Sequence, residues 1–587
     1  MSKLNPQKED SSFRVVINQN NGNWLFFEHP VQVLQTENHS DVKHLLEVIE
    51  EKVAEGFYAA GFLSYEAAPA FDPALTVYEC KGFPLLWFGI FKEPDIGPLP
   101  SGNPEFHYVS DWEPAMDFSV YQSAINRIKS FIESGDSYQV NYTFRMRSGA
   151  VADPWQTFLA VTENNPMPFA SYIDTGKHVI SSFSPELFFS LDGEHIVTRP
   201  MKGTAPRGRF ISEDLENARN LYISEKDRAE NIMIVDMLRN DLGRIARVNS
   251  VEVKDLFRVE KYQSVLQMTS QVSATTDSPV SEIFSALFPC ASVTGAPKVR
   301  TMEIIKELEK SPRKIYCGST GYISPNRKAV FSVAIRTLLF DKENNRAEYG
   351  TGSGIIWDSD ARREYEECLT KAEVIARKSQ RFGLIETMRW SPEQGYFLLE
   401  RHLRRLENSM GYFDFCGDIE KVKQYLFSLA GQFEISPIRV RIEVSRDGRI
   451  SHTVSPLNKT DKESLLVGIA SLPVHSSDRF LFHKTTNRSV FTDAVKACPG
   501  FDDILLWNER GEVTETTIGN VVVELEGELF TPAIDCGLLP GTFREELLSR
   551  GEIKEAVISV EELRNCNAVY RINSVREWER VVVEGWG

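Results

Sequence analysis

The 587-residue chain lacks the cysteine spacing of a disulfide framework or a zinc site, because its eight cysteines are scattered without a Cys-x-x-Cys pair. Its longest apolar run, near Leu85–Phe88, is far too short to span a bilayer. Positive charge is in deficit: 66 Lys and Arg stand against 83 Asp and Glu, and the net charge of −17 argues against a nucleic-acid or anionic-membrane partner. The polar start Met1–Asp10 has no apolar targeting core. These absences predict a cytoplasmic protein with free, structural thiols.

The length of the chain exceeds what one hydrophobic core usually supports, so we expect two or three domains. The first hundred residues alternate strand-like runs such as Phe13–Ile17 with turns, and Pro94–Pro104 has the Pro/Gly content of a crossing between subdomains. A basic, polar stretch at Arg377–Arg381 marks a domain boundary. Apolar residues at three- and four-residue steps predict helices at Tyr121–Ser134, Glu225–Ile245, Val299–Leu308 and Glu364–Lys378. The expected domains are residues 1–105, 106–378 and 382–587.

One segment is more informative than the rest: Arg199-Pro-Met-Lys-Gly-Thr-Ala-Pro-Arg-Gly208, a strand-like run that enters a turn. Gly203 and Gly208 leave room for a close approach to Lys202. A lysine taken at random is usually a solvated surface residue, so the segment needs support from other parts of the chain.

Ordered blocks over about residues 110 to 375 supply that support. The lysine segment resembles the Pro-Ile-Lys-Gly-Thr signature of the chorismate-utilising enzymes, in which lysine marks aminodeoxychorismate synthases and alanine marks anthranilate synthases. A single Gly-rich turn would be weak evidence, whereas six further blocks in family order are not expected by chance. These blocks are Asp136-Ser-Tyr-Gln-Val-Asn-Tyr-Thr143, Ser184-Pro-Glu186, Ala229-Glu-Asn-Ile-Met-Ile-Val-Asp236, Arg239-Asn-Asp-Leu242, Ser292-Val-Thr-Gly-Ala-Pro-Lys298 and Gly352-Ser-Gly354.

The resemblance implies an α+β fold, an antiparallel β-sandwich with helices, and a reaction that replaces the C4 hydroxyl of chorismate with an amine. Lys202 matches the nucleophile that attacks ring C2, after which ammonia enters at C4 and expels the lysine. Glu186 matches the acid that protonates the leaving hydroxyl, a role that requires a raised pKa near neutral pH. Relatives that form anthranilate add ammonia at C2 directly, so an anthranilate-type synthase is the alternative that Lys202 argues against.

Two carboxylate pairs at i,i+3 spacing lie on predicted helix faces, and most such pairs are simply solvated. Here they coincide with the magnesium site of the family, which implies Mg²⁺ bound by Glu230 and Glu367, with Asp227 and Glu364 acting directly or through water. Chorismate is a dianion, and the resemblance gives it a further set of binding residues. These are Arg336, Lys371, Tyr316, Ser292, Gly295 and the Gly352–Gly354 backbone.

Three features bear on the partners and ligands of this first module. Gln267 stands where many relatives have a histidine, and a glutamine can donate a hydrogen bond but cannot carry a proton. Leu63-Ser-Tyr-Glu66 resembles the start of the family's tryptophan pocket, which leaves open whether tryptophan binds. The chain has no Gly-x-Cys-x-Gly nucleophile elbow, so we expect a separate glutamine amidotransferase subunit to supply ammonia, with free ammonia as the alternative.

The region from Phe382 to Gly587 resembles the fold type IV enzymes that use pyridoxal 5′-phosphate, a group that includes aminodeoxychorismate lyase and branched-chain and D-amino-acid aminotransferases. The resemblance implies that Lys484 holds the cofactor and moves a proton, that Glu515 pairs with the pyridine nitrogen, and that Arg405 binds the phosphate. Thr542, Phe543 and Ser574 would assist at the phosphate. The matching blocks are Phe382-Gly-Leu-Ile-Glu-Thr-Met388, His402-Leu-Arg-Arg-Leu406, Lys484-Thr-Thr-Asn487, Glu512-Val-Thr-Glu515, Gly519-Asn520 and Leu539-Pro-Gly-Thr-Phe543.

The fusion of the two modules predicts a bifunctional enzyme of folate biosynthesis that makes 4-aminobenzoate and pyruvate from chorismate by way of 4-amino-4-deoxychorismate. The second module begins almost at Phe382, without the first strands of its family, so an aminotransferase or a degenerate scaffold that recruits the glutaminase remains an alternative. Arg446 is a candidate for binding a substrate carboxylate.

Overall fold

The computed structural model describes residues 13–103, 112–149, 153–372, 382–433, 437–457 and 463–585. The chain divides into two compact units. Unit 1 comprises residues 1–205 and 220–379, and unit 2 comprises residues 206–219 and 380–587.

Within its described residues, unit 1 contains two ten-stranded sheets whose paired strands run antiparallel. The first sheet has the order β16 (Gly295–Ala296), β8 (Gln139–Ser148), β20 (Arg346–Ile355), β19 (Thr337–Asp341), β10 (His178–Ser184), β9 (Phe169–Asp174), β1 (Arg14–Asn18), β2 (Trp24–Glu28) and β6 (Asp95–Gly97), with β7 (Glu113–Pro114) beside β8. The second has the order β13 (Met201–Pro206), β15 (Val265–Thr275), β12 (His195–Arg199), β11 (Leu187–Asp192), β18 (Lys328–Val333), β17 (Ser319–Ser324), β4 (Tyr58–Leu63), β5 (Leu86–Phe91) and β3 (Gln32–Thr36), with β14 (Glu252–Lys261) beside β15.

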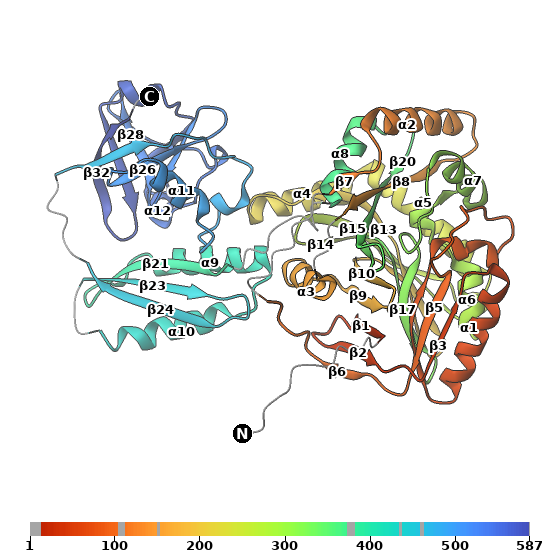
Figure 1. The fold of residues 1–587 in the computed structure, drawn as a ribbon. Helices are drawn as coiled ribbons and strands as arrows, with labels where there is room; N and C mark the ends of the chain where they lie inside the picture. The colour runs from red at the N-terminus through yellow and green to blue at the C-terminus, as the bar shows by residue number, and fades with distance from the viewer. Residues whose placement is uncertain are drawn as a thin grey trace. The chain divides into compact units, whose positions relative to one another are not determined.

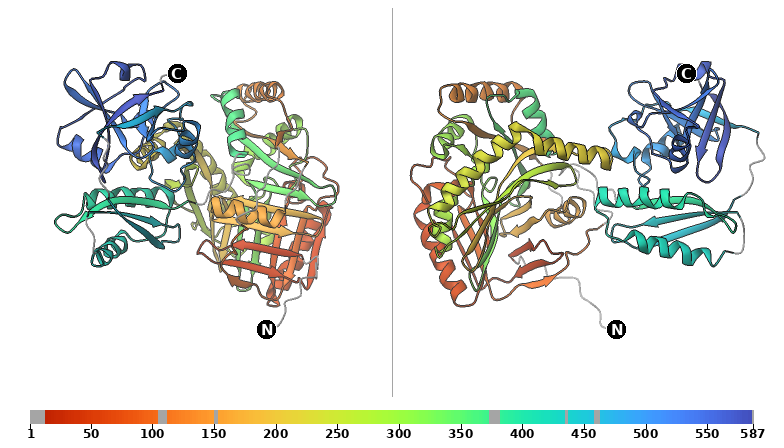
Figure 2. Two further views of the ribbon diagram at one scale, coloured as in Figure 1. Left: turned by 60° about the vertical axis from the view of Figure 1, so that its left-hand side comes forward. Right: turned by 180° about the vertical axis from the view of Figure 1, so that it is seen from behind.

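The two sheets pack face to face, because one buried cluster contains Val15 and Phe27 of the first sheet together with Phe62 and Trp87 of the second. Alternation along each strand leaves a second apolar face for helices to cover. Helices α1 (His39–Ala54), α5 (Glu225–Gly243) and α6 (Val280–Leu287) pack on the second sheet, and Figures 1 and 2 show α1 and α6 beside β3, β5 and β17. Helices α2 (Phe118–Glu133), α3 (Pro154–Asn164), α7 (Lys298–Leu308) and α8 (Ala361–Ala372) pack on the first sheet. The expected β-sandwich with helices is therefore confirmed.

In unit 2, a four-stranded sheet has the order β22 (Gly395–Tyr396), β21 (Leu384–Ser391), β23 (Ile438–Val444) and β24 (Ile450–Pro456). Helices α9 (Leu399–Phe413) and α10 (Ile419–Ala430) pack on it through one apolar cluster. An eight-stranded mixed sheet, accompanied by α11 (Ser489–Ala497) and α12 (Thr542–Ser549), completes the described part of the unit. Its order is β27 (Val513–Thr516), β26 (Asp503–Trp507), β25 (Leu465–Ile469), β32 (Glu577–Glu584), β31 (Ala568–Asn573), β28 (Asn520–Leu525), β29 (Glu528–Pro532) and β30 (Lys554–Ala556).

A short segment, Pro206–Arg219, belongs to unit 2 although the chain on either side of it belongs to unit 1. It includes most of α4 (Ile211–Ile223). The Tyr412 hydroxyl donates to the Gly208 carbonyl at 2.6 Å, and the Arg209 guanidinium reaches the Asp535 carboxylate at 2.8 Å. The division by contacts therefore differs here from the ranges that we expect from the sequence, because nothing in the local pattern marks a segment that packs elsewhere.

The expected helices agree with α2, α5, α7 and α8 to within a few residues, although the end of the fourth, from residue 373 on, lies outside the described residues. The expected crossing Pro94–Pro104 contains the short strand β6, which pairs with β2, and its last residue also lies outside the description. All eight cysteines carry free thiols. Among the described helices, none combines the length and apolar character needed to cross a membrane.

Candidate active sites

Lys202 lies on the edge strand β13, where the two glycines of its surroundings make room for it. A Cβ on Gly354 would lie 2.5 Å from the Lys202 amine nitrogen, and Gly203 has a φ of +97° with its Cα facing the Asp227 side chain. Only glycine adopts such a φ without strain, so the strand can turn sharply just after the lysine. The Lys202 Nζ forms an ion pair with Glu230 of α5 at 3.2 Å.

Hydrogen bonds hold the backbone on both sides of Lys202. The Asn231 amide donates to the Lys202 carbonyl at 3.2 Å, and the Gln267 amide donates to the Gly203 carbonyl at 2.8 Å. The Gln267 oxygen accepts from the Thr204 hydroxyl at 3.0 Å. The glutamine that replaces the family's histidine thus clamps the strand that carries the lysine, a role that needs no proton transfer.

Glu186, the candidate acid, is buried at the start of β11 and is 3% exposed. Burial raises the pKa of Glu186 to about 7, although a hydrogen bond from Ser292 and the charge of Lys202 oppose the shift. Its Oε1 has no hydrogen-bond partner among the described protein atoms. A carboxyl with this pKa is half protonated at neutral pH, which meets the requirement for a general acid.

The four predicted metal ligands are only partly brought together. Glu230 pairs with Lys202, and Glu367 of α8, which feels the charge of Lys202, pairs with Lys371 at 2.7 Å. Burial alone would raise the pKa of Glu367, but Lys371 and Lys202 hold it below its usual range. Asp227 instead accepts from the helix-capping hydroxyl of Ser224.

Among the described residues, no three acidic, histidine or cysteine side chains form a metal-binding group. Mg²⁺ often takes one or two carboxylates and keeps several waters. Glu230 of α5 and Glu367 of α8 both interact with Lys202, and their carboxylates are hard oxygen donors. These two carboxylates are chemically suited to hold a Mg²⁺ ion that keeps the rest of its ligands as water. Direct coordination by Asp227 and Glu364 stays a prediction.

The predicted substrate-binding residues fall into two groups. Arg336 lies half-buried at a φ of 51°, and burial lowers the pKa of its guanidinium, which reaches the Met167 sulfur at 3.7 Å. Lys371 donates to the Gly352 carbonyl at 3.0 Å, and Ser292 bonds the acid Glu186. Tyr316 is instead packed in the core against Gly350, and Gly295 lies against the Gln139 backbone in the pairing of β16 with β8. These two residues therefore have evident packing roles.

Gln139 is a functional candidate that the sequence reading missed, although it lies inside the quoted block 136–143. Its side chain is fully buried, and neither its amide nitrogen nor its oxygen has a partner among the described protein atoms. A Cβ on Gly354 would lie 3.1 Å from this amide nitrogen, so Gln139 and Lys202 flank the same point. Unsatisfied buried amides are costly, which favours a ligand at this position.

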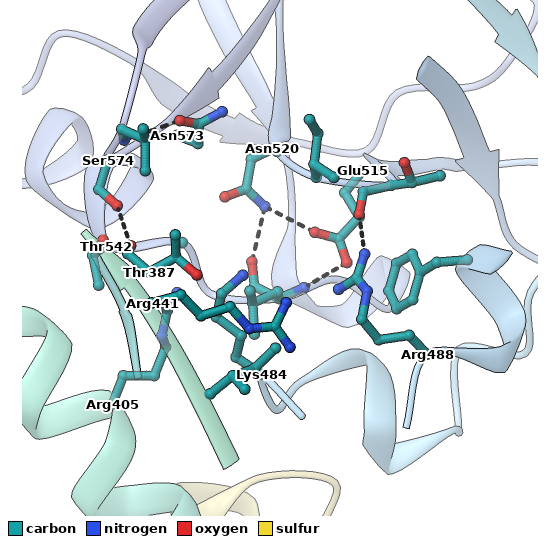
Figure 3. A pocket seen from close by; sticks show the side chains of 18 of the residues that line it. Thr387, Arg405, Arg441, Lys484, Arg488, Glu515, Asn520, Thr542, Asn573 and Ser574 are labelled. Carbon is teal, nitrogen blue, oxygen red and sulfur yellow. Dashed lines mark hydrogen bonds between the residues drawn. The ribbon is translucent and has the colours of Figure 1, made fainter. Parts of the chain in front are cut away.

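Unit 2 contains a cavity of about 270 Å³ that brings together most of its predicted site residues, among them Lys484, Glu515, Arg405, Thr542 and Ser574 (Figure 3). Burial, with a contribution from the charge of Arg405, lowers the pKa of Lys484 to about 8. Burial raises the pKa of Glu515 to about 8, although the Leu539 N–H, which donates at 3.1 Å, opposes this. A lysine that gives up its proton easily and a carboxyl that keeps one suit a pyridine cofactor between them.

Arg405 lies at the opposite end of the cavity from Arg488, beside the N-terminus of α12 (Figure 3). Its guanidinium donates two hydrogen bonds to Glu386, at 2.9 and 2.7 Å, and one to the Pro540 carbonyl. Burial alone would raise the pKa of Glu386, but the charges of Arg405 and His402 and their hydrogen bonds hold this pKa at about 2. A fixed arginine next to a helix N-terminus suits a phosphate group.

Of the other residues predicted to bind the phosphate, some line the cavity with their side chains and others do not. Thr542 and Ser574 line the cavity, whereas the Phe543 ring is buried in the apolar cluster beneath α12, so only its backbone could assist. Gly541 admits no side chain, because a Cβ there would lie 1.9 Å from the Asn520 Oδ1. Arg446, the candidate for a substrate carboxylate, is not among the lining residues. Arg441 and Arg488 line the cavity instead, and the sequence reading missed both.

Two protein families match successive parts of the chain. Residues 10–377 match the family described as chorismate binding enzyme, and residues 383–582 match class IV of the aminotransferases. Aminodeoxychorismate synthase component 1 of Escherichia coli strain K12 is 40% identical over 279 residues, 47% of this chain and 61% of that protein. Anthranilate synthase component 1 3 of Haloarcula marismortui is 32% identical over 396 residues, 60% of this chain and 76% of that protein.

The solved structures support the fold of unit 1. The crystal structure of anthranilate synthase component I from Streptococcus pneumoniae has a TM-score of 0.53 and 24% identity, and the match covers 64% of this chain and 94% of that one. The chain spans about three fifths of the length of the synthase from E. coli. It belongs to the family of chorismate binding enzymes, joined to a class IV aminotransferase domain.

Proposed function

We propose that the chain makes 4-aminobenzoate from chorismate in two steps, one in each unit. The observation that carries the first step is the pairing of Lys202, where anthranilate-forming relatives have alanine, with a buried acid, Glu186, whose pKa is about 7. The 40% identity to an aminodeoxychorismate synthase component supports the same assignment.

In the first step, the Lys202 amine attacks ring C2 of chorismate, both ring double bonds shift, and the C4 hydroxyl leaves as water with the proton of Glu186. Ammonia then adds at C4, the double bonds shift back, and the C2–N bond to Lys202 breaks; the proton that the new amine loses returns to Glu186, which gives 4-amino-4-deoxychorismate and restores both the lysine and the acid. Arg336 and Lys371 hold substrate carboxylates. When bound by Glu230 and Glu367, Mg²⁺ would supply positive charge for one carboxylate.

In the second step, 4-amino-4-deoxychorismate loses pyruvate. Pyridoxal phosphate, when bound, supplies an electron sink at the substrate's amine-bearing carbon. Lys484 removes the C4 proton, which its lowered pKa favours, and returns a proton to the departing enolpyruvyl group. Glu515 keeps the pyridine nitrogen protonated, and Arg405, Thr542 and Ser574 hold the phosphate. A separate glutamine amidotransferase supplies the ammonia.

The test is to incubate the full chain with chorismate, Mg²⁺, ammonium and pyridoxal phosphate and to separate the products by chromatography, with Lys484→Ala protein alongside. We expect 4-aminobenzoate from the native chain and 4-amino-4-deoxychorismate from the variant. If both proteins stop at 4-amino-4-deoxychorismate, unit 2 is not a lyase. Anthranilate from the native chain would overturn the assignment of Lys202.

A further inference from the structure

The cavity of unit 2 carries more positive charge than its cofactor needs. Among the described residues that line it, Glu515 is the one carboxylate, whereas the cations are Arg405, Arg439, Arg441, Lys484, Arg488 and Arg576. Arg405 and Lys484 serve the cofactor in the proposed function, and Arg576 has an acidic neighbour in Glu579, 3.7 Å away. The excess that remains lies on Arg439, Arg441 and Arg488.

Arg441 reaches the cavity from the four-stranded sheet. It lies on β23, where Val440 and Ile442 point into the apolar cluster under α9 and α10, so Arg441 is on the opposite face. Its partner in register on β21 is Thr387, another lining residue. Within the described part of the chain, Arg441 forms no ion pair with a carboxylate.

Arg488 reaches the same cavity from the N-terminus of α11. It directly precedes α11, its guanidinium stacks on the Phe491 ring at 4.5 Å, and one of its nitrogens donates to the Thr517 carbonyl. Burial lowers the pKa of Arg488 and the charge of Arg441 adds to this, although the carboxylates of Glu515 and Asp503 oppose the shift. Two guanidinium groups that repel each other across a cavity are stabilised by an anion between them.

Arg441 and Arg488 lie away from the phosphate end. Figure 3 shows Arg405, Thr542 and Ser574 on one side of Lys484, Arg488 beside Glu515 on the other, and the guanidinium of Arg441 between. A phosphate held by Arg405 therefore leaves both arginines free for the substrate. An amino acid with one carboxylate needs only one of them.

We propose that Arg441 and Arg488 select a substrate with two carboxylates, which rests on the proposed second step because 4-amino-4-deoxychorismate is such a dianion. Each guanidinium binds one carboxylate through two parallel N–H bonds. The pair thus distinguishes this pocket from one that accepts ordinary monocarboxylate amino acids.

The test uses a matched pair of unreactive ring compounds, 3-(carboxymethoxy)benzoate and 3-methoxybenzoate, which differ by one carboxylate. Their dissociation constants are measured on the full chain loaded with pyridoxal phosphate, from the change in cofactor absorbance. We expect the dicarboxylate to bind about tenfold more tightly or better, and this ratio to fall to about one in the double variant Arg441→Gln, Arg488→Gln. Arg580→Gln, an exposed charge on β32, is the control and should keep the native ratio.

Two further measurements make the outcome decisive. Arg441→Lys keeps the charge but loses the planar fork, so an intermediate ratio supports two-point recognition. An unchanged ratio in the double variant, or loss of the cofactor from it, overturns the proposal. Release of 4-aminobenzoate by the same native sample is assayed in parallel: if it is absent while the ratio still falls, the lyase assignment fails and the selectivity stands.

Discussion

The two lysines of the candidate sites, one in each unit, lie in surroundings of different charge. Carboxylates gather near Lys202: Glu230 forms its ion pair, Glu367 feels its charge, and Glu186 is buried close by. Near Lys484, Arg405 and Arg488 add to the effect of burial although Glu386 and Glu515 oppose it, and cations outnumber carboxylates among the described residues that line the cavity. A dianion bound at the first site therefore needs an added cation, whereas the second site already has the charge to hold one.

The same difference determines how each lysine becomes available as a base or nucleophile. Lys484 is surrounded by protein, and its pKa of about 8 leaves a useful fraction uncharged near neutral pH. Lys202 is an ion-paired group on an edge strand, so its pairing with Glu230 must be replaced when substrate binds. A metal ion that took Glu230 as a ligand would free the amine, which would link the proposed Mg²⁺ to the proposed nucleophile.

The largest effect that tests this contrast is expected from Lys202→Ala. The variant loses the covalent step, so formation of 4-amino-4-deoxychorismate should fall by roughly 10³-fold, with anthranilate as the product that replaces it. Chromatography of the products of chorismate, Mg²⁺ and ammonium measures both. Lys254→Ala, an exposed lysine of β14, should behave like the native chain. A variant that still made the 4-amino product at the native rate would break the assignment.

A smaller effect is expected from pH, through Glu186. Its folded pKa of about 7 lies above the ordinary 4.5, so the folded chain keeps this proton between those values and loses it as pH rises through 7. If the protonated form is the acid, kcat/KM of the first step should fall about tenfold per unit above pH 7. The same shift makes burial of the ionised form unfavourable, so stability of unit 1 also falls from pH 4.5 to 7. A flat rate profile between pH 6 and 9 would exclude Glu186 as the acid.

The sequence predicts the parts of each candidate site that lie in continuous motifs. Lys202, Glu186, Lys484 and Glu515 are each carried by a block of adjacent residues. Arg441 and Arg488 are different, because they reach one cavity from a strand and from the start of a helix that are far apart in the sequence, and only the alternation of β23 places Arg441 on the cavity side. Long-range packing of this kind leaves no local pattern. Tyr316 shows the converse: its motif position indicates a ligand contact, but the absence of a side chain on Gly350 lets its ring pack in the core.

Segment 206–219 escaped prediction for a related reason. Most of it lies in the polar helix α4, which continues past the segment, and its assignment to unit 2 depends on partners such as Tyr412, about two hundred positions away. The fold class could be predicted because the periodicities of strands and helices are visible in the local sequence. The residues against which a surface helix packs are distant in the sequence, so no local pattern identifies them.

A more modest effect on the first site is expected from Gln267→Leu, which keeps the shape but removes the hydrogen bonds to Gly203 and Thr204. Each such bond contributes about 1 kcal/mol, so kcat for the amination should drop roughly tenfold because the lysine strand is less fixed. The thermal unfolding midpoint should change little in comparison. Gln271→Leu, elsewhere on β15, is the control; an equal loss of activity there would show that the effect is not specific to the clamp.

The smallest effect is expected from Tyr412→Phe, which asks whether the segment downstream of Lys202 stabilises unit 2. The phenylalanine keeps the ring under the Arg207 guanidinium, at 4.5 Å, but leaves the Gly208 carbonyl without its donor. The free energy of unfolding of unit 2 should fall by about 1 kcal/mol. The measurement is the loss of the absorbance of bound cofactor on heating. Tyr425→Phe removes an exposed hydroxyl that contacts His452 and should cost much less. Equal stability of the two variants would mean that the segment's contacts with unit 2 contribute little, and the two lysine sites would then be independent in folding as well as in charge.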